Sequence, residues 1–463
     1  MQKFISKYAL AAHLALLAVA PLFLFPFFGP KDTAIVLLWM SFLTMFWFFL
    51  EPSRRIDEYL YEARRRVLRN LLVDPLVWLF VLFLTVAFIR WMNDGVVRDF
   101  DLSGDQWKWV IRSPAIEWLP GSSGDAGFYA VATLVAVVVV VSSCRHALGK
   151  SARTMFVFLA AFFAAVAALV AVWTTRDEMG VACKIAFGDA GASSFPGTAF
   201  GIFFLASLAA LAGMFEARWN LAMLLFSFAV GGTFTGLWYF SSPFEITLYS
   251  CAGALLALIS LVNVAVTRGV LSFFKFLVAL IIGAAIPVAI MKSFAPAELI
   301  ELKSAVLTFD FWSDECMQAR QAWIDFASEV WRNGNIWNGV GLGALPLYIK
   351  QNMAQDSWVA NIPGGWWQLL AERGIVGVGM LVLPCLFMMF SFIARIASSG
   401  VKRAFWPFVC LGLFVFSAVI VEAFFDVSFL SPEVLIPAGA FLALSTSAIP
   451  PKRTAEKKKK EKQ

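Results

Sequence analysis

The segment 292–373 is too polar to cross a bilayer and too aromatic to be a simple linker. Within it, Gly339, Gly341 and Gly343 alternate in the sequence GVGLG. Glycine tolerates a positive φ angle and lets the backbone approach a ligand closely, so these backbone amides could bind a phosphate group. The alternative is a tight turn that leads into a helix, because a short glycine run alone is a weak signal.

A second set of aromatic and polar residues follows the breaker Pro363-Gly364-Gly365. The spacing of WWQLLAERG predicts a short helix that ends at Gly374. Trp366 and Trp367 at its start could stack on a sugar ring, or they could anchor the segment at the membrane interface. Both interpretations stay open.

The composition places this chemistry in a membrane protein. Of 463 residues, 60% are hydrophobic and 15% are charged, with a mean hydropathy of +0.77. Soluble globular proteins carry about 25% charged residues, so a soluble chain of this composition would expose too much apolar surface. Separate apolar runs reach the roughly 20 residues that a transmembrane helix needs. The sequence therefore predicts an all-α, polytopic integral membrane protein.

Twelve transmembrane spans are predicted, with the long polar segment between the ninth and the tenth. Their approximate limits are 7–28, 33–50, 74–92, 126–144, 154–173, 197–215, 219–240, 244–265, 270–291, 374–394, 404–421 and 430–449. The predicted divisions are 1–291 (nine spans), 292–373 (an extracytoplasmic helical head), 374–449 (three spans) and 450–463 (a basic tail).

Basic clusters set the predicted orientation. The stretch 51–70, which we expect to form an interfacial helix, and the lysine-rich tail hold much of the net charge of +6. Cytoplasmic loops carry an excess of Lys and Arg, so both termini are expected in the cytoplasm. Because this charge flanks apolar spans, it indicates no nucleic-acid partner, and membrane lipids are the expected surroundings. The loop 93–125 is expected on the other side of the membrane.

The six cysteines lack the CxxC spacing of a zinc or redox site, so no metal is predicted. Cys183 and Cys316 are the two that are predicted outside the cytoplasm. They could form a disulfide, or both could be unpaired.

Several motifs resemble those of the O-antigen ligase and polymerase superfamily of bacterial inner membranes. The sequence ARQAWIDFASEVWRNGNIWNGVGLG supplies Arg320 and Trp323 and then the alternating glycines. QLLAERGIVGVG supplies the family's Leu-x-Glu-x-Gly pattern at Leu370, Glu372 and Gly374. The segment SSFPGTAFGIFFLA resembles the family's Asn-Pro-Asn loop and keeps its proline.

The resemblance implies a glycosyltransferase that needs neither a metal nor another cofactor. Its donor would be a glycan linked to undecaprenyl pyrophosphate, and its acceptor would be a second glycan or a lipid. Such a reaction serves the polymerisation or ligation of cell-surface polysaccharides such as lipopolysaccharide. The leaving pyrophosphate gains negative charge in the transition state, which fixed cations would stabilise.

Candidate cations and bases follow from this resemblance. Arg320 is the leading catalytic candidate, because the family motif falls on it. The family's histidine falls on Pro363, so this chain departs from the family there; a carboxylate could act as the base instead, and Asp356 and Glu372 are nearest to the motif. Further candidates for substrate binding are cations that could instead be solvated loop charges: Arg332, Lys350, Arg176 and Lys184. Glu372 could alternatively make a structural contact at a helix end.

Two other functions stay open. A catalytically silent relative could bind polyprenyl glycans or act as a scaffold in an export complex, which the missing histidine favours. A transporter would carry ionisable residues in the middle of its spans, whereas Arg90, Glu216 and Glu245 are predicted at span ends.

Overall fold

The computed structural model places most of the membrane-spanning chain and part of the head. The described residues are 2–28, 30–50, 68–93, 96–101, 106–111, 116, 119–121, 124–148, 150–175, 195–214, 220–294, 314–345, 348–349, 362, 364–399, 406–424 and 431–447. Most of the predicted interfacial helix at 51–70 and the basic tail at 450–463 lie outside them.

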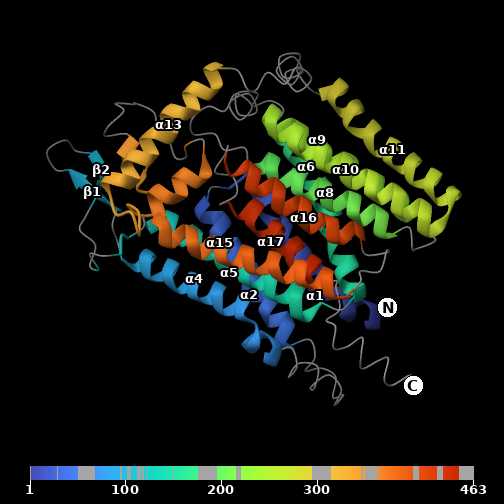
Figure 1. Ribbon diagram of the computed structural model, residues 1–463, viewed down its shortest axis with the longest axis horizontal. Coiled ribbons are helices and arrows are strands. Elements are labelled where there is room, and N and C mark those ends of the chain that lie inside the picture. The colour runs from blue at the N-terminus through green and yellow to red at the C-terminus, as the bar shows by residue number, and fades with distance from the viewer. Residues whose placement is uncertain are drawn as a thin grey trace.

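The described chain is almost entirely helical (Figure 1). The helices are α1 Gln2–Leu24, α2 Pro30–Leu50, α4 Pro75–Met92, α5 Gly124–Ser142, η2 Ser143–Ala147, α6 Lys150–Thr175, α8 Phe195–Met214, α9 Asn220–Phe240, α10 Pro243–Arg268, α11 Val270–Phe294, α13 Asp314–Asn333, α15 Gly365–Ser399, α16 Trp406–Glu422 and α17 Pro432–Ser447. Each predicted span overlaps one of these helices, and α13 lies in the predicted head.

Seven helical segments within the described residues are long and apolar enough to cross a membrane. They are Pro75–Met92, Ala126–Ala147, Ala152–Thr175, Met223–Phe240, Pro243–Arg268, Val270–Ile290 and Gly365–Ala394. Four shorter apolar helices accompany them: Tyr8–Leu24, Pro196–Ala212, Trp406–Glu422 and Pro432–Thr446. The prediction of a helical membrane protein is confirmed at this level.

One element differs from the all-helical prediction. The loop after α4 contains a two-stranded antiparallel hairpin, formed by β1 Val96–Asp101 and β2 Gln106–Ile111, with Val96 opposite Ile111. Valine and aromatic residues recur in both strands, a composition that favours extended structure. The strands lie at the same end of the bundle as α13 (Figure 1), which we call the head end.

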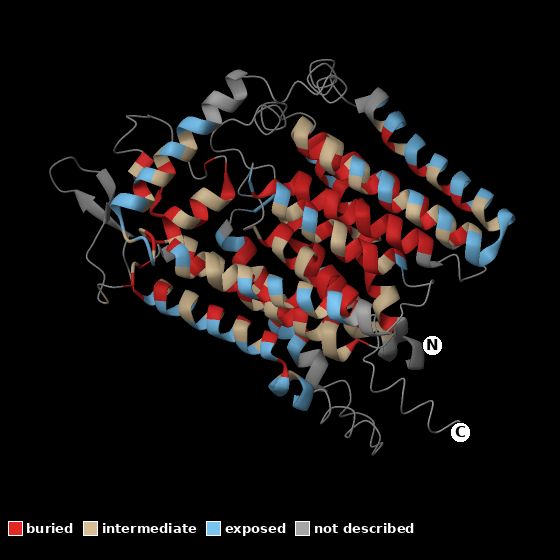
Figure 2. Ribbon diagram, viewed as in Figure 1, coloured by how far each residue is buried: buried red, intermediate tan, exposed pale blue. Residues whose placement is uncertain are grey.

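The core of the bundle surrounds α8. Its buried residues occur on all sides of the helix, and Figure 2 shows the burial concentrated in the centre of the bundle. A helix that is apolar on every side is suited to this position. Outer helices such as α10 and α11 expose long apolar faces instead (Figure 2), as expected where lipid replaces protein.

Small residues let α6 and α9 approach closely. A Cβ atom added to Gly232 would lie 2.7 Å from Ala165 Cβ, and one added to Gly236 would lie 2.8 Å from Ala168 Cβ. Gly232 and Gly236 form a GxxxG pattern, which favours close helix packing in membranes. Larger side chains at these glycines would force the two helices apart.

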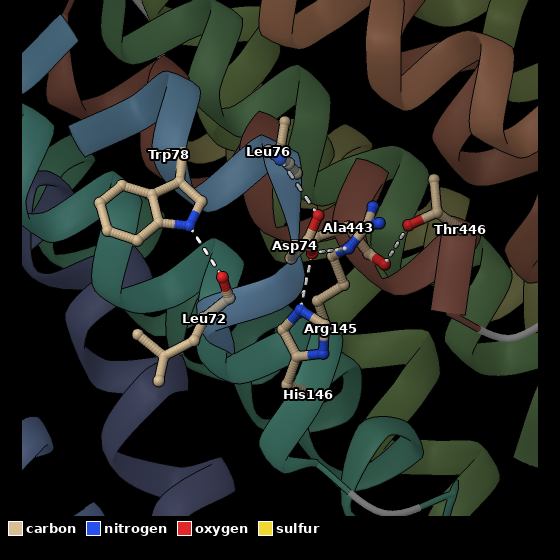
Figure 3. A network of polar contacts seen from close by, with 8 residues as sticks. All are labelled: Leu72, Asp74, Leu76, Trp78, Arg145, His146, Ala443 and Thr446. Atoms are coloured by element: carbon tan, nitrogen blue, oxygen red, sulfur yellow. Dashed lines mark hydrogen bonds and ion pairs between the residues drawn. The ribbon is translucent and has the colours of Figure 1, made fainter. Parts of the chain in front are cut away.

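At the opposite end of the bundle, Asp74 joins α4 to η2 (Figure 3). Its Oδ1 accepts a hydrogen bond from the Leu76 amide (3.1 Å) and so caps α4. Its Oδ2 accepts from Arg145 Nε (2.8 Å) and pairs with His146 Nε2 (2.7 Å). In the π-helical turn η2, the Leu148 amide donates to Ser143 O, and this turn directs both neighbouring side chains to one carboxylate. Asp74 and Arg145 are buried.

Replacing Asp74 by asparagine should destabilise the protein. Asn keeps an oxygen that can cap α4, but the charge of Arg145 is then buried without its partner. Breaking a buried ion pair in this way costs about 3–5 kcal/mol. We expect a clearly lower unfolding temperature for D74N in detergent. The exposed Asp325→Asn should change it little, and an unchanged unfolding temperature for D74N would contradict a stabilising role.

The same pair should make stability depend on pH in acid. Burial by itself would raise the pKa of Asp74, but the hydrogen bond from His146 and the charge of Arg145 together hold this pKa below its ordinary value. The stabilisation is therefore complete above the unfolded-state pKa of about 4, and it is lost as the pH falls through the lower native pKa. We expect the unfolding temperature of the wild type, but not that of D74N, to show this loss below about pH 4.

Candidate functional site

A break in α15 organises the head end. Gly374 has φ 63° and ψ −172°, so the helix is interrupted there and two helical segments meet at a kink. This agrees with the helix end predicted at Gly374. A Cβ atom at Gly374 would collide with the backbone of Trp337 and Asn338. Glycine is therefore required both for the left-handed φ angle and for the close approach of a second backbone segment.

The turn at 334–345 fills this break. The amides of Ile375 and Val376, which begin the second segment of α15, donate to Ile336 O (3.1 Å) and Trp337 O (2.9 Å). In return, the amides of Val340 and Gly341 donate to two carbonyls that end the first segment, Ala371 O (2.8 Å) and Glu372 O (3.0 Å). The four bonds satisfy backbone groups that a broken helix would otherwise leave unpaired.

The alternating glycines belong to this contact. Gly339, Gly341 and Gly343 all have positive φ angles. A Cβ atom at Gly339 would collide with the backbone of Glu372, and one at Gly341 would collide with Gly121 O. The Gly343 amide donates to Glu372 Oε1 (3.1 Å). The amides of Gly341 and Gly343 are thus occupied within the protein, as the turn interpretation expects, and their binding of substrate stays a prediction.

Glu372 is buried and serves the same turn. Besides the Gly343 amide, its carboxylate accepts a hydrogen bond from the Leu345 amide. These bonds are the structural contact at a helix end that the sequence left open. Its role as a catalytic base stays a prediction.

Beside this turn, two arginines face one cavity. Arg90, in the last turn of α4, is buried, and its Nη2 donates to Asn338 Oδ1 (3.2 Å). Arg373 precedes the break in α15, and its guanidinium carbon lies 5.6 Å from the centre of the Phe83 ring. The Nε atoms of both arginines are buried without a hydrogen-bond partner. Among the described residues, no carboxylate forms an ion pair with either side chain.

The cavity lies between α4, α5 and α15. It has a volume of about 20 Å³, space for one water-sized group. Its other walls are apolar or small: Phe83, Val86, Ala87, Gly127, Ala130, Leu342, Gly377 and Met380. Two neighbouring guanidinium groups whose Nε atoms lack a hydrogen-bond partner, in apolar surroundings, attract an anion, and a single phosphate oxygen is of the size that the cavity accepts.

A buried carboxylate ties three other helices together near the head. Glu422, at the end of α16, is fully buried and accepts hydrogen bonds from Thr198 Oγ1 of α8 and from Tyr249 OH of α10 (2.8 Å). The Trp366 amide at the start of α15 donates to Ala423 O (3.2 Å), directly after this glutamate. Within the described residues, no group of three or more His, Cys, Asp or Glu side chains is placed to hold a metal ion.

The two predicted sugar-stacking tryptophans have different surroundings. The Trp366 ring is partly buried against the membrane core and lies 6.3 Å from the Phe424 ring. Trp367 packs in a small apolar core of the head, with Ala327 and Val330 of α13 and Leu345 of the turn. Both rings therefore contribute to packing, and stacking on a sugar stays a prediction.

The remaining predicted cations fall in different parts of the chain. Arg332 is exposed in the last turn of α13. Arg320 also lies in α13, but its side chain lies outside the described set. Four predicted site residues are outside the described residues altogether: Arg176, Lys184, Lys350 and Asp356. The disulfide predicted between Cys183 and Cys316 stays a prediction, because Cys183 lies outside the described residues and the side chain of Cys316, in α13, is not described.

Sequence reasoning missed both arginines of the cavity as binding residues. Arg90 was noted only as a charge at a span end, and Arg373 stands beside the motif glutamate. The sequence did contain an indication for Arg90, because an ionisable residue within an apolar span usually marks a functional site. Nothing in the sequence indicates that Arg90 and Asn338, which are 248 positions apart, are in contact.

No protein-family model matches the chain, and no curated protein matches it.

A methyl group at Gly339 should loosen the contact between the turn and α15. Gly339→Ala forces a left-handed φ angle on alanine, which costs about 1–2 kcal/mol, and adds a collision with the Glu372 backbone. We expect faster proteolysis of the head and a lower unfolding temperature. Gly379→Ala is the matched control. Gly379 lies in α15 with open space around it, so this change should be neutral or mildly stabilising. Equal behaviour of the two variants would contradict this account.

Proposed function

We propose that this protein is a glycosyltransferase of the O-antigen ligase and polymerase type. It would transfer or polymerise a glycan carried on a polyprenyl diphosphate at the outer face of a bacterial inner membrane. In this proposal the chain crosses the membrane twelve times, both termini are cytoplasmic, and the head end faces outward. The acceptor is a second glycan or a lipid, and the reaction needs no metal.

The observation that carries this proposal is the pair Arg90 and Arg373 at one cavity. Burying two like charges near each other is unfavourable in the empty protein, where, among the described residues, only the neighbouring Glu372 carboxylate offsets the charge of Arg373. A bound diphosphate would remove this cost, and it would gain further stabilisation as the bond to the sugar breaks and charge develops on the leaving oxygen. Guanidinium groups suit this role, since each presents several fixed donors to phosphate oxygens.

The position of the cavity also supports a lipid-linked donor. Its walls come from α4 and α15, and α4 exposes Phe88 and Ile89 near the same end. These apolar side chains would contact the lipid bilayer. A polyprenyl chain could therefore remain in the membrane while its diphosphate reaches the arginines. A soluble nucleotide sugar would gain nothing from such surroundings.

A silent glycan-binding protein is the second candidate. It is favoured by the occupation of Glu372, whose carboxylate is used by the turn amides and so is not free to take a proton from an acceptor hydroxyl. In the enzymatic proposal, this task falls to Asp356 or to Glu372 after the turn has opened. Both candidates predict diphosphate binding, and only the enzyme predicts a change in glycan length.

Removing either arginine of the cavity should abolish activity without weakening the fold. We expect Arg90→Gln and Arg373→Gln to reduce glycan polymerisation by about 10²–10³-fold, the usual cost of one fixed donor in such a site. Each change removes one of two neighbouring buried like charges, and glutamine can still donate a hydrogen bond, for example to Asn338, so the unfolding temperature should stay close to that of the wild type. Surface-glycan chain length in a complemented deletion strain measures activity, and thermal unfolding of the purified variants measures stability.

Arg268→Ala, at the other end of the bundle, is the control and should retain full-length glycan. Wild-type glycan from both arginine variants at normal protein abundance would reject the proposed site. Loss of protein in both variants would instead assign the arginines to the fold.

Arg320 provides a separate test of the family resemblance. If a guanidinium at this position binds two phosphate oxygens, Arg320→Lys should fail nearly as badly as Arg320→Ala while protein levels stay normal. If Arg320 only pairs with a neighbouring carboxylate such as Asp314, Glu315 or Asp325, stability should fall instead. Full-length glycan from Arg320→Ala at wild-type abundance would remove it from the catalytic residues.

A further inference from the structure

A groove on the lipid-facing side of the bundle contains a lysine that has no ion-pair partner within the described part of the chain. It lies between α9 and α11, at the end opposite the head, where the short turn at Gly269 joins α10 to α11 (Figure 1). Its volume is about 340 Å³, far larger than that of the arginine cavity. The residues that line it are Met223, Leu224, Ser227, Leu271, Phe274, Lys275, Val278, Ala279 and Ile282.

The groove is apolar except at one edge. Leu224, Phe274 and Val278 are all more than half exposed along it, while Ala279 is buried at its floor. The Ser227 hydroxyl is already used, because it donates to Met223 O (2.9 Å). Lys275 is thus the polar group of this groove that is left to meet a ligand. A hydrocarbon chain fits the remainder of the surface.

Among the described residues, no carboxylate forms an ion pair with Lys275. Neither α9 nor α11 contains an acidic residue, and the single acidic residue of α10, Glu245, is at the head end. The lysine stands five residues after Val270, about 7.5 Å along the helix. From this depth its long side chain can reach the membrane interface, where lipid phosphates lie.

We propose that the α9–α11 groove binds one anionic phospholipid of the leaflet away from the head. One acyl chain fills the apolar groove, and Lys275 pairs with the phosphate of the headgroup. Basic pockets between transmembrane helices recognise anionic lipid headgroups in this way. A second copy of this chain would have to supply a carboxylate or leave the lysine unpaired, so the charge favours the lipid. This inference does not depend on glycan transfer.

The test is the binding of phosphatidylglycerol to the full-length protein in detergent, measured by native mass spectrometry. Phosphatidylcholine with identical acyl chains serves as the neutral comparison. A lysine near the membrane surface contributes about 1 kcal/mol to the attraction of anionic lipid, which is about fivefold in affinity. We therefore expect phosphatidylglycerol to bind about fivefold more tightly than phosphatidylcholine, and Lys275→Gln to remove this difference. Lys275→Arg should retain it.

Two further variants separate the groove from simple surface attraction. Val278→Trp fills the groove and keeps Lys275, so it should displace the bound lipid. Ile281→Trp adds the same bulk on the exposed side of α11 outside the groove and should bind lipid like the wild type. Equal affinity for the two lipids, or normal binding by Val278→Trp, would overturn the proposal. A dimer that Val278→Trp dissociates would assign the groove to a second copy of the chain and overturn it as well.

Discussion

The head depends on a reciprocal set of backbone hydrogen bonds across the broken helix at Gly374. The turn carbonyls of Ile336 and Trp337 accept hydrogen bonds from the amides that begin the second helical segment. In the other direction, two amides of the turn donate to the carbonyls of Ala371 and Glu372, which end the first segment. In an unbroken helix, these amides and carbonyls would form hydrogen bonds to each other within the helix, and none would be available to the turn. The break is therefore what makes a stable attachment between the membrane helices and the polar segment possible.

The arginine cavity depends on the same attachment. Arg373 is the last residue before the break, and Asn338, which holds Arg90, belongs to the turn. Both charges thus lie where the two backbones are fixed against each other. Preorganised cations of this kind need no rearrangement when charge develops on a ligand, which is the main advantage of a protein site over water. The backbone contact that holds the head in place therefore also fixes the positions of the two buried charges.

The sequence predicts the helices well because long apolar runs have few other solutions in a membrane. It also predicts the helix end at Gly374, where glycine follows a short amphipathic helix. It does not predict the hairpin at β1 and β2, because strand patterns of six residues are weak beside transmembrane runs. The pairing of Arg90 with Arg373 depends on how distant helices pack, and one sequence carries no record of that packing.

The carboxylate of Glu422 has a mechanical consequence. It joins the head ends of α8, α10 and α16 to one another through buried interhelical hydrogen bonds. The groups that line the cavity between α4 and α15 are mostly apolar, and such contacts can slide or part at little cost. At the head end, α8, α10 and α16 are thus joined by polar bonds, whereas the lining of the cavity between α4 and α15 is mostly apolar, with the Arg90–Asn338 hydrogen bond as its polar link to the turn. If the cavity were to widen, the apolar contacts along α4 would therefore be the ones to separate, while the polar bonds around Glu422 would keep α8, α10 and α16 together.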